Sequence, residues 1–356
     1  MKTLGLAAIL LSVNSLYGEP CGPSAPKEGI AEFLHDALNI PDRIEVSVGD
    51  FDASPIPCYV KTLVLIGNGD RKKPFTVSVA TDNSYLILAD VQPLPDGLLN
   101  PAAVRQALHL PESAAVNLGE LQKSIYKPFL KFTVRVSDAE LPQPLYLTSD
   151  RLSLIAGLIF PFKKTLYVDA ASLTHGYSDG PANAPVEIIE YSDLQCPACA
   201  RADQFLRDIV VKKYGNKIRF LYAEFPLTQI HDWAFLGATA SQCVQQLKPG
   251  GLPAFRSAVF SNQRQINKNN ARAQLASLAE QEGINSADFS GCMDRPEASE
   301  HVKQQIADGK KLEIVTTPTF VINGQVMPGL PKPERFLKAI DSALLPAASC
   351  LCNLPQ

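Results

Sequence analysis

The sequence predicts a multidomain protein that combines α+β units with an α/β domain. The first half contains an internal repeat of about 70 residues, and the second half has a Cys-x-x-Cys pair between a buried-strand pattern and a helical run. At 356 residues the chain is long enough for two or three cores. A net charge of only −3, without a long basic run, gives no reason to expect nucleic acid as a partner.

The N-terminus has the pattern of an export signal. Met1-Lys2 supplies a positive charge, Leu4–Val13 is almost wholly apolar, and small residues follow in Ser15–Gly18. The apolar run is too short to span a bilayer as a stable helix. We therefore expect residues 1–18 to be a cleaved signal peptide and the mature chain to act in the periplasm or otherwise outside the cytoplasm.

The first half of the chain repeats itself in order and spacing. Ala37–Pro41 is echoed by Ala107–Pro111, and Asp82–Ile87 is echoed by Asp150–Ile155. Agreement of hydrophobic positions, turn residues and order predicts a tandem duplication. The alternative is chance similarity between two α+β segments.

The two predicted repeat units are residues 25–97 and 98–165. Each reads as a helix followed by a small antiparallel sheet, because β-branched and aromatic residues alternate in the expected strands. The expected helices are 30–38 and 102–108, and the expected strands are 60–66, 75–80, 85–91, 130–136, 145–148 and 153–159. This half shows no paired acids, metal-ligand cluster or phosphate loop, so we expect it to bind or assemble rather than to carry chemistry.

Residues 166–184 are turn-rich and polar, which predicts a linker. After it, Val186–Tyr191 has the pattern of a short buried strand, and Cys196 and Cys199 lie between that strand and a helical run. A strand, a dithiol at the turn and a helix are the thioredoxin arrangement. We expect this domain to cover residues 185–346.

A Cys-x-x-Cys pair can be a redox dithiol, half of a metal site or a structural disulfide. A zinc site needs a second close pair, and Cys350-x-Cys352 lacks the usual two-residue spacer. At a helix start, Cys196 would face unpaired N–H groups and the positive end of the helix dipole, which favour the thiolate. We expect Cys196 to be the thiol that attacks and Cys199 to be the thiol that resolves the mixed disulfide. The sulfur pair itself carries the two electrons of the redox reaction, so no cofactor is expected.

Two further positions fit a redox centre. An X–Pro bond is the low-cost route to a cis peptide, and a cis Thr317–Pro318 bond facing the dithiol would leave the backbone of Thr317 free to pair with an extended substrate. Glu190 is expected to be buried beneath the dithiol, where it could move the proton of Cys199. The alternatives are an ordinary trans proline and a solvated or lysine-paired glutamate.

Three runs around these residues resemble the DsbA family of exported thiol–disulfide oxidoreductases. The runs are Glu190–Cys199, Glu224–Leu227 and Thr317–Gly324. The resemblance implies that Cys196 is the nucleophile, Cys199 its partner, Pro318 the cis proline and Glu190 the buried acid. It also implies a helical insertion at about 227–312 within the thioredoxin-like fold.

The same resemblance assigns roles to other side chains. Some members carry a second disulfide where Cys243 and Cys292 fall, which implies a structural bridge. His231 and Trp233 are expected to be packing residues of the insertion. The residues expected to lie along a bound substrate are Thr317, Pro197 and Ala198.

The N-terminal units carry a different resemblance. Leu145–Gly157 is similar to the dimerisation domain of exported disulfide isomerases of the DsbC/DsbG kind, which implies small cystatin-like units. In those isomerases, copies from two chains pair to build one substrate cleft. Two copies lie in this one chain, so we expect them to pair within the chain and to supply a peptide-binding surface without a dimer.

Together these features predict thiol–disulfide interchange on cysteine-containing exported clients, with a membrane redox partner that recycles the dithiol. The direction stays open, because Glu190 and the insertion favour an oxidase whereas the N-terminal units favour an isomerase. Pro197 matches strong oxidants, but Ala198 lacks a side chain that could interact with the thiolate. We therefore predict a redox potential between a strong oxidant and a thioredoxin-like reductant. A chaperone-like binder with an incidental dithiol is the alternative.

Overall fold

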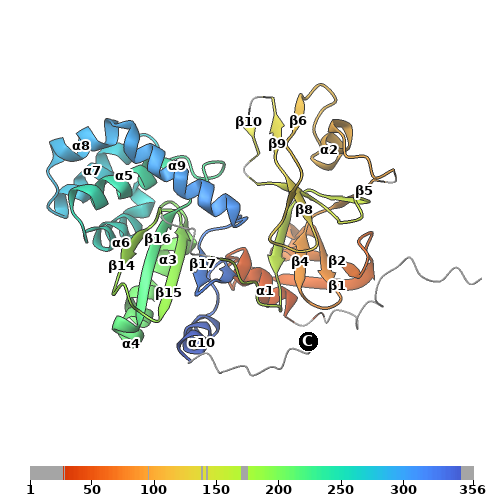
Figure 1. Cartoon of the computed structure of the whole chain (residues 1–356), viewed down its shortest axis with the longest axis horizontal. Helices are drawn as coiled ribbons and strands as arrows, with labels where there is room; N and C mark the ends of the chain where they lie inside the picture. The colour runs from red at the N-terminus through yellow and green to blue at the C-terminus, as the bar shows by residue number, and fades with distance from the viewer. Residues whose placement is uncertain are drawn as a thin grey trace, which may run out of the picture.

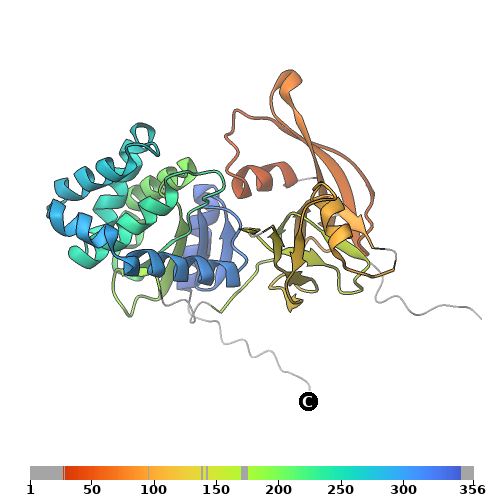
Figure 2. The same ribbon diagram turned by 90° about the horizontal axis from the view of Figure 1, so that it is seen from above.

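The computed structural model describes residues 27, 29–94, 96–137, 139–141, 143–169 and 175–345. The chain forms an N-terminal β-rich half and a C-terminal α/β domain, and helix α1 lies between the two (Figure 1 and Figure 2). The expected signal peptide, Cys21, Cys350 and Cys352 lie outside the described residues. None of the described helices is long and apolar enough to cross a membrane.

The N-terminal half contains three antiparallel sheets, with strand orders β1-β2-β3-β4-β13, β5-β12-β11-β8-β7 and β10-β9-β6. Two short helices accompany these sheets. The elements are α1 (Ile30–Ala37), β1 (Val46–Ala53), β2 (Tyr59–Ile66), β3 (Lys73–Ala80), β4 (Tyr85–Leu88), β5 (Val91–Pro93), α2 (Pro101–Ala107), β6 (Val116–Leu118), β7 (Gln122–Lys123), β8 (Leu130–Phe132), β9 (Val134–Val136), β10 (Ala139–Glu140), β11 (Leu145–Leu147), β12 (Ser153–Ile155) and β13 (Leu158–Pro161), with a 3₁₀ turn at Gly69–Arg71.

The two five-stranded sheets exchange strands. β13 pairs with β4 in the first sheet, and β5 pairs with β12 in the second. The runs expected as continuous strands at 85–91 and 153–159 are therefore broken, and the second part of each joins the other sheet. The crossing segments are so close that a side chain on Gly157 would collide with the Leu88 carbonyl. The expected boundary between residues 97 and 98 thus divides strands that are hydrogen-bonded to each other.

Helix α1 forms because its apolar side chains recur at helical spacing and face the first sheet. Ile30, Phe33 and Leu34 are buried against strands β2 and β3. The helix ends at Ala37 with Leu38 as its C-cap, and Asn39 follows in the left-handed region at φ 55°. His109 occupies the corresponding place after α2, at φ 52°.

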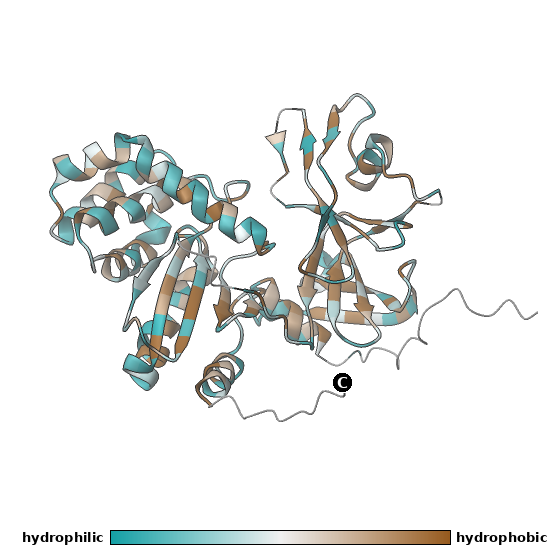
Figure 3. Ribbon diagram, viewed as in Figure 1, coloured by the Kyte–Doolittle hydropathy of each residue, from teal (hydrophilic) through white to brown (hydrophobic). Residues whose placement is uncertain are grey.

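The C-terminal domain contains one five-stranded sheet with the order β14-β16-β15-β17-β18. β15 and β16 run parallel, and the other pairs are antiparallel. The central strands are hydrophobic along most of their length because both faces of the sheet are covered (Figure 3). The strands are β14 (Tyr177–Asp179), β15 (Val186–Ser192), β16 (Ile218–Glu224), β17 (Thr319–Ile322) and β18 (Gln325–Pro328).

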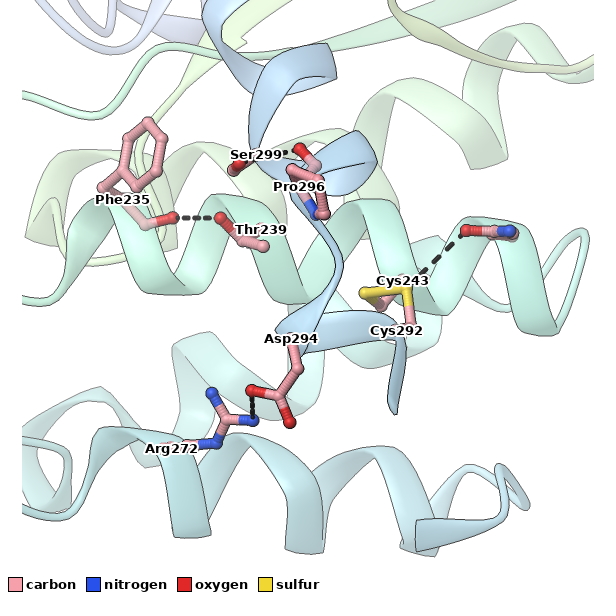
Figure 4. Close-up of a disulfide and its surroundings, with 9 residues drawn as sticks. Phe235, Thr239, Cys243, Arg272, Cys292, Asp294, Pro296 and Ser299 are labelled. Atoms are coloured by element: carbon pink, nitrogen blue, oxygen red, sulfur yellow. Dashed lines mark hydrogen bonds and ion pairs between the residues drawn. A yellow bond between two sulfur atoms is a disulfide. The ribbon is translucent and has the colours of Figure 1, made fainter. Parts of the chain in front are cut away.

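Helices surround this sheet, and five of them form the insertion between β16 and β17 (Figure 1). The helical elements are α3 (Pro197–Phe205), a π-type segment (Leu206–Val211), α4 (Lys212–Tyr214), α5 (Ala234–Leu247), α6 (Leu252–Asn262), α7 (Ala271–Gln281), α8 (Ser286–Asp294), α9 (Pro296–Lys311) and α10 (Pro333–Leu344), with 3₁₀ turns at Gly215–Lys217 and Gln263–Gln265. A disulfide between Cys243 in α5 and Cys292 in α8 ties the insertion together (Figure 4).

The segment expected as a linker is bound to the C-terminal sheet over much of its length. Tyr167 forms an antiparallel bridge with Gln325. Beside it, the backbone N–H of Val168 donates to the Gly324 carbonyl at 2.9 Å. β14, which lies within the same expected linker, adds an edge strand to the sheet. The junction is therefore an ordered part of the C-terminal domain wherever the structure describes it.

A buried carboxylate joins the second unit to the C-terminal domain. Glu313 follows α9 and is almost fully buried. Its carboxylate accepts from the Ser124 hydroxyl at 2.8 Å and from the Ile125 backbone N–H at 2.9 Å, and it forms an ion pair with Lys131 at 2.9 Å. These hydrogen bonds satisfy a charge that would otherwise be costly to bury.

Candidate active site

The dithiol lies where β15 leads into α3. Cys196 caps the helix with extended backbone angles, and Pro197 occupies the first helical turn, where a missing N–H does no harm. Cys199 follows one turn inside the helix. The Cys196 side chain is 7% exposed and Cys199 is fully buried, and both are free thiols.

The surroundings shift the two thiol pKa values in opposite directions. A hydrogen bond from the Cys199 side chain, together with the backbone N–H groups of Cys199 and Ala198, lowers the pKa of Cys196 to about 6 although burial opposes it. Burial raises the pKa of Cys199 well above its ordinary value, and its contacts with Cys196 and the charge of Glu190 add to this. One sulfur is therefore a thiolate near neutral pH, and the other stays protonated.

A buried aspartate fixes the loop that precedes Cys196. The Asp193 carboxylate accepts from the backbone N–H groups of Gln195 at 2.7 Å and Leu227 at 2.8 Å. It also pairs with His231 Nδ1 at 2.7 Å. Burial lowers the pKa of His231, but the hydrogen bond and charge of Asp193 outweigh it and leave this pKa raised. His231 therefore stabilises the loop through an ion pair in addition to the packing role expected from the sequence.

The insertion holds the same loop from a second side. Gln263 donates through its carboxamide to the carbonyls of Leu194 at 2.7 Å and Cys196 at 3.1 Å. The Gln195 side chain accepts from the backbone N–H of Trp233 at 2.8 Å, and the Trp233 ring is buried in the core. The insertion is thus a scaffold for the dithiol loop.

The peptide bond between Thr317 and Pro318 is cis and lies beside the dithiol. The Cys196 thiol donates to the Thr317 carbonyl, with sulfur and oxygen 3.3 Å apart. The same carbonyl accepts from the Asn39 side chain at 3.0 Å. The carbonyl of Thr317 is therefore engaged, whereas we had expected it to be free for substrate. A second cis bond joins Lys127 and Pro128.

The three residues expected along a substrate differ in how accessible they are. Pro197 is exposed at the start of α3. The side chains of Ala198 and Thr317 are buried. A client can therefore touch Pro197 directly, whereas Thr317 is covered in this structure, its backbone included.

Glu190 lies on the helix-covered face of β15 and shares a buried arginine with a second carboxylate. Arg256 of α6 pairs with Glu190 at 3.1 Å and with Glu224 of β16 at 3.3 Å. All three side chains are almost completely buried, and the guanidinium also lies 4.8 Å from the Tyr222 ring centre. Glu190 is therefore neither solvated nor lysine-paired.

Burial dominates the titration of this cluster. It raises the pKa of Glu190, with Arg256 acting in the opposite direction. It raises the pKa of Glu224 to about 7, again against Arg256. The two carboxylates share one cation in a buried environment, so burial favours their protonated forms and the charge of Arg256 favours their ionised forms.

Arg256 and Asn39 are site residues that the sequence reasoning did not identify. Arg256 did leave a signal, because a lone arginine in the apolar helix Leu252–Asn262 requires a buried partner. Asn39 left none, because it contacts Thr317 across 278 positions of sequence. Among the described residues, no group of three or more histidine, cysteine or acidic side chains could hold a metal ion.

The fold and the site together define the class of the C-terminal domain. It has a five-stranded sheet, a Cys-x-x-Cys pair at a helix start and a cis proline beside the dithiol. Residues 174–342, just under half of the chain, match the family model described as Thioredoxin. The C-terminal domain therefore has a thioredoxin-like fold and is similar to this family over the matched residues.

Named relatives are similar over a comparable length. A probable disulfide bond formation protein D from Bacillus cereus is 24% identical over 170 residues, which are 46% of this chain and 77% of that protein. The Na(+)/H(+) antiporter NhaA 3 from Salinispora tropica is 25% identical over 168 residues, 47% of this chain and 24% of the antiporter. The chain therefore spans about a quarter of the length of the antiporter relatives it matches.

Solved structures match a similar share of the chain. Oxidised BdbD from Bacillus subtilis has a TM-score of 0.43 at 20% identity and covers 48% of this chain and 94% of that one. The α-DsbA1 protein of Wolbachia pipientis has a TM-score of 0.42 at 22% identity and covers 47% of this chain and 90% of that one.

Proposed function

We propose that the chain catalyses thiol–disulfide interchange on exported protein clients through Cys196 and Cys199. The observation that carries this proposal is that the pKa values of the two thiols are shifted in opposite directions. The pKa of Cys196 is lowered to about 6, whereas the pKa of buried Cys199 is raised. One thiol is ready to attack, and the other is held back until a mixed disulfide has formed.

In the first step the Cys196 thiolate attacks a client disulfide. A bond forms between Cys196 and one client sulfur, and the other client sulfur leaves as a thiolate. The charge on Cys196 is one of the causes that raise the pKa of Cys199. Bond formation removes that charge, so the pKa of Cys199 falls when this sulfur has to react.

In the second step Cys199 loses its proton and attacks Cys196. The client leaves as a dithiol, reduced by two electrons, and Cys196 and Cys199 become a disulfide. Glu190 is the proton acceptor in this step, because its Oε1 has no hydrogen-bond partner within the described part of the chain and its charge acts on Cys199. Run backward, the same two steps oxidise a reduced client.

Whether the protein oxidises or reduces its clients depends on how the dithiol is recycled. We propose a membrane redox partner for this task, and either oxidase or isomerase activity.

The test supplies the reduced protein to scrambled, fully oxidised ribonuclease. Recovery of ribonuclease activity that vanishes in Cys196→Ala would establish an isomerase. No recovery, together with rapid oxidation of reduced ribonuclease by the disulfide form, would establish an oxidase. Failure of both reactions would refute the proposed function.

The N-terminal half provides the client-binding surface in this proposal. A cleft of about 730 Å³ lies between loops 54–60 and 124–130, which correspond in the repeat. Its lining is rich in apolar and aromatic side chains, which suit an extended, unfolded client segment. Among them are Ile56, Tyr59, Tyr85, Phe129, Leu166 and Tyr167. The last two belong to the segment that pairs with β18, so one wall of the cleft continues onto the C-terminal sheet.

A substitution in this wall tests the assignment. Tyr167 is 67% exposed, so Tyr167→Ala should not disturb the core. We expect it to weaken binding of an unfolded client several-fold, because aromatic side chains supply much of the contact energy at such surfaces. Leu63→Ala is the matched control, since Leu63 is exposed on β2 and does not line the cleft. Equal effects of the two variants would contradict this role for the cleft.

The exchange of β5 and β13 supports a second part of the proposal. The two units, which are small cystatin-like modules in this proposal, pair within one chain and need no partner chain. We expect light scattering to give the mass of a monomer. An obligate dimer held together by residues 30–160 would contradict this arrangement.

A further inference from the structure

The end of α1 contacts the C-terminal domain beside Cys196. The Asn39 side chain donates to the Thr317 carbonyl at 3.0 Å and accepts from the Leu330 backbone N–H at 3.0 Å. A backbone carbonyl can only accept a hydrogen bond and a backbone N–H can only donate one, so these two partners define which end of the carboxamide is nitrogen and which is oxygen. The Asn39 carboxamide thus presents one donor and one acceptor to backbone groups. An extended peptide presents the same two groups when it pairs with an exposed edge.

The carbonyl that Asn39 occupies is the one nearest to the attacking sulfur. β17 begins at Thr319, so Thr317 lies just outside the sheet. Its carbonyl oxygen lies 3.0 Å from the Asn39 amide nitrogen and 3.3 Å from the Cys196 sulfur. Both side chains therefore occupy positions beside this oxygen even when Cys196 is a thiolate and donates no hydrogen bond. A client that approaches Cys196 by pairing its backbone with Thr317 needs the position that Asn39 holds.

The contact is closely fitted rather than loose. Gly329 is at φ 74°, and a side chain there would collide with the backbone carbonyl of Asp36 near the end of α1. Two ion pairs flank the approach, Lys332 with Glu32 at 2.7 Å and Arg335 with Asp36 at 3.6 Å. Because surface ion pairs contribute little, the backbone fit and the Asn39 hydrogen bonds define this contact.

The second unit provides an internal comparison. His109 takes the same left-handed position after α2 as Asn39 takes after α1. Both turns are closed by the same backbone hydrogen bond, from Ile40 to His35 and from Leu110 to Arg105, each at 2.9 Å. The exposed His109 shows that this turn does not need an asparagine. The carboxamide of Asn39 is therefore explained by its contact with the C-terminal domain.

We propose that Asn39 is a specificity-determining residue that occupies the client position at Thr317. A client segment has to replace the carboxamide with its own backbone N–H before its sulfur reaches Cys196. Segments that can lie extended against Thr317 displace the end of α1, and segments that cannot are excluded. This inference rests on the proposed function of the dithiol, whose first step it makes selective.

The test compares Asn39→Gly with His109→Gly in the full chain. Glycine tolerates positive φ, so both variants keep the turn and the first removes only the interdomain carboxamide. The rate at which reduced protein attacks a disulfide-bearing extended peptide is divided by its alkylation rate with iodoacetamide. We expect this ratio to rise about fivefold in Asn39→Gly, the change that loss of a net hydrogen bond makes, and to stay constant in His109→Gly. An unchanged or lower ratio in Asn39→Gly would overturn the proposal.

A second measurement follows α1 directly. In Cys199→Ala, which holds the peptide as a mixed disulfide on Cys196, amide exchange at 36–40 should be faster than in the peptide-free protein. Retained protection would contradict displacement of α1. The outcomes also separate the two proposals. Protein that alkylates normally but never attacks any protein or peptide disulfide would refute the proposed function, whereas attack with an unchanged rate ratio would refute only the role of Asn39.

Discussion

The two halves of the molecule bury different kinds of side chain. Around the dithiol, the C-terminal domain buries Glu190, Asp193, Glu224 and Arg256 almost completely. In the described part of the N-terminal half, Asp36 is the one charged residue buried to a comparable degree. Both halves pack aromatic rings edge to face, but in the N-terminal half such rings also lie beside the cleft, for example Tyr85 and Tyr126 with centroids 5.8 Å apart.

This difference is consistent with the proposed division of roles between the two halves. Buried charge is costly and is retained where it tunes reactive groups. Aromatic surface is suited to contact with many client sequences because it needs no specific polar partner. In the proposed function, the chemistry belongs to the C-terminal domain and client contact to the N-terminal half.

The largest effect is expected from the nucleophile. Cys196→Ala should abolish disulfide exchange, because Cys199 is fully buried and stays protonated. Binding of an unfolded client, measured by fluorescence anisotropy, should be unchanged, because the cleft lies in the other half. Refolding activity that survives this substitution would instead favour a chaperone-like binder with an incidental dithiol.

The next effect concerns the buried cation. Arg256→Met should lower the free energy of unfolding by about 3–5 kcal/mol at pH 8, because it leaves two buried carboxylates without a partner. The loss should shrink at acid pH, where both carboxylates are protonated. Arg272→Met is the matched control, since Arg272 makes an exposed ion pair with Asp294 (Figure 4) and should change stability little. Urea unfolding that is equally sensitive to both variants would contradict the role of the cluster.

A smaller effect is expected at the resolving step. Glu190→Gln should slow release of the mixed disulfide about tenfold or more, because Cys199 loses its proton acceptor. Quenched-flow analysis would show the client–Cys196 adduct accumulating. Glu187→Gln is the control, because Glu187 points to the other face of β15 and pairs at the surface with Arg219. A normal release rate in Glu190→Gln would leave the proton route to another group.

The smallest expected effect is the pH dependence of Cys196 alkylation in the reduced wild-type protein. Iodoacetamide should react with Cys196 along a curve whose midpoint is near pH 6, the lowered pKa of this thiol. The folded state prefers the thiolate, so this group stabilises the reduced protein fully above the ordinary thiol pKa. That contribution is lost as the pH falls through about 6. A midpoint near pH 9 would contradict the stabilised thiolate.

The sequence was most informative where the physics is local. A strand, a Cys-x-x-Cys pair and a helix start are neighbours in the chain, so the thioredoxin-like fold and the positions of Cys196 and Cys199 could be predicted. The burial of Glu190 followed from strand alternation on β15. The repeated helix-to-strand pattern predicted both helices and several strands of the N-terminal half. It missed β1, and the run expected as one strand at 130–136 divides into β8 and β9, which belong to different sheets.

Long-range contacts account for what could not be predicted. Continuous runs at 85–91 and 153–159 give no sign that each divides between two sheets, because propensity does not record the partner strand. The partner of Glu190 came from an insertion helix 66 positions away in sequence. The Asn39 carboxamide resembles any helix-ending asparagine until the two halves are placed side by side.

The central claim is that this dithiol exchanges disulfides with protein clients through Cys196. The most direct test incubates the Cys199→Ala protein with scrambled ribonuclease, traps adducts in acid and maps them by mass spectrometry. The account predicts a covalent adduct that joins Cys196 to a ribonuclease cysteine and disappears on reduction. Absence of any adduct from folded protein whose Cys196 still reacts with iodoacetamide would contradict it.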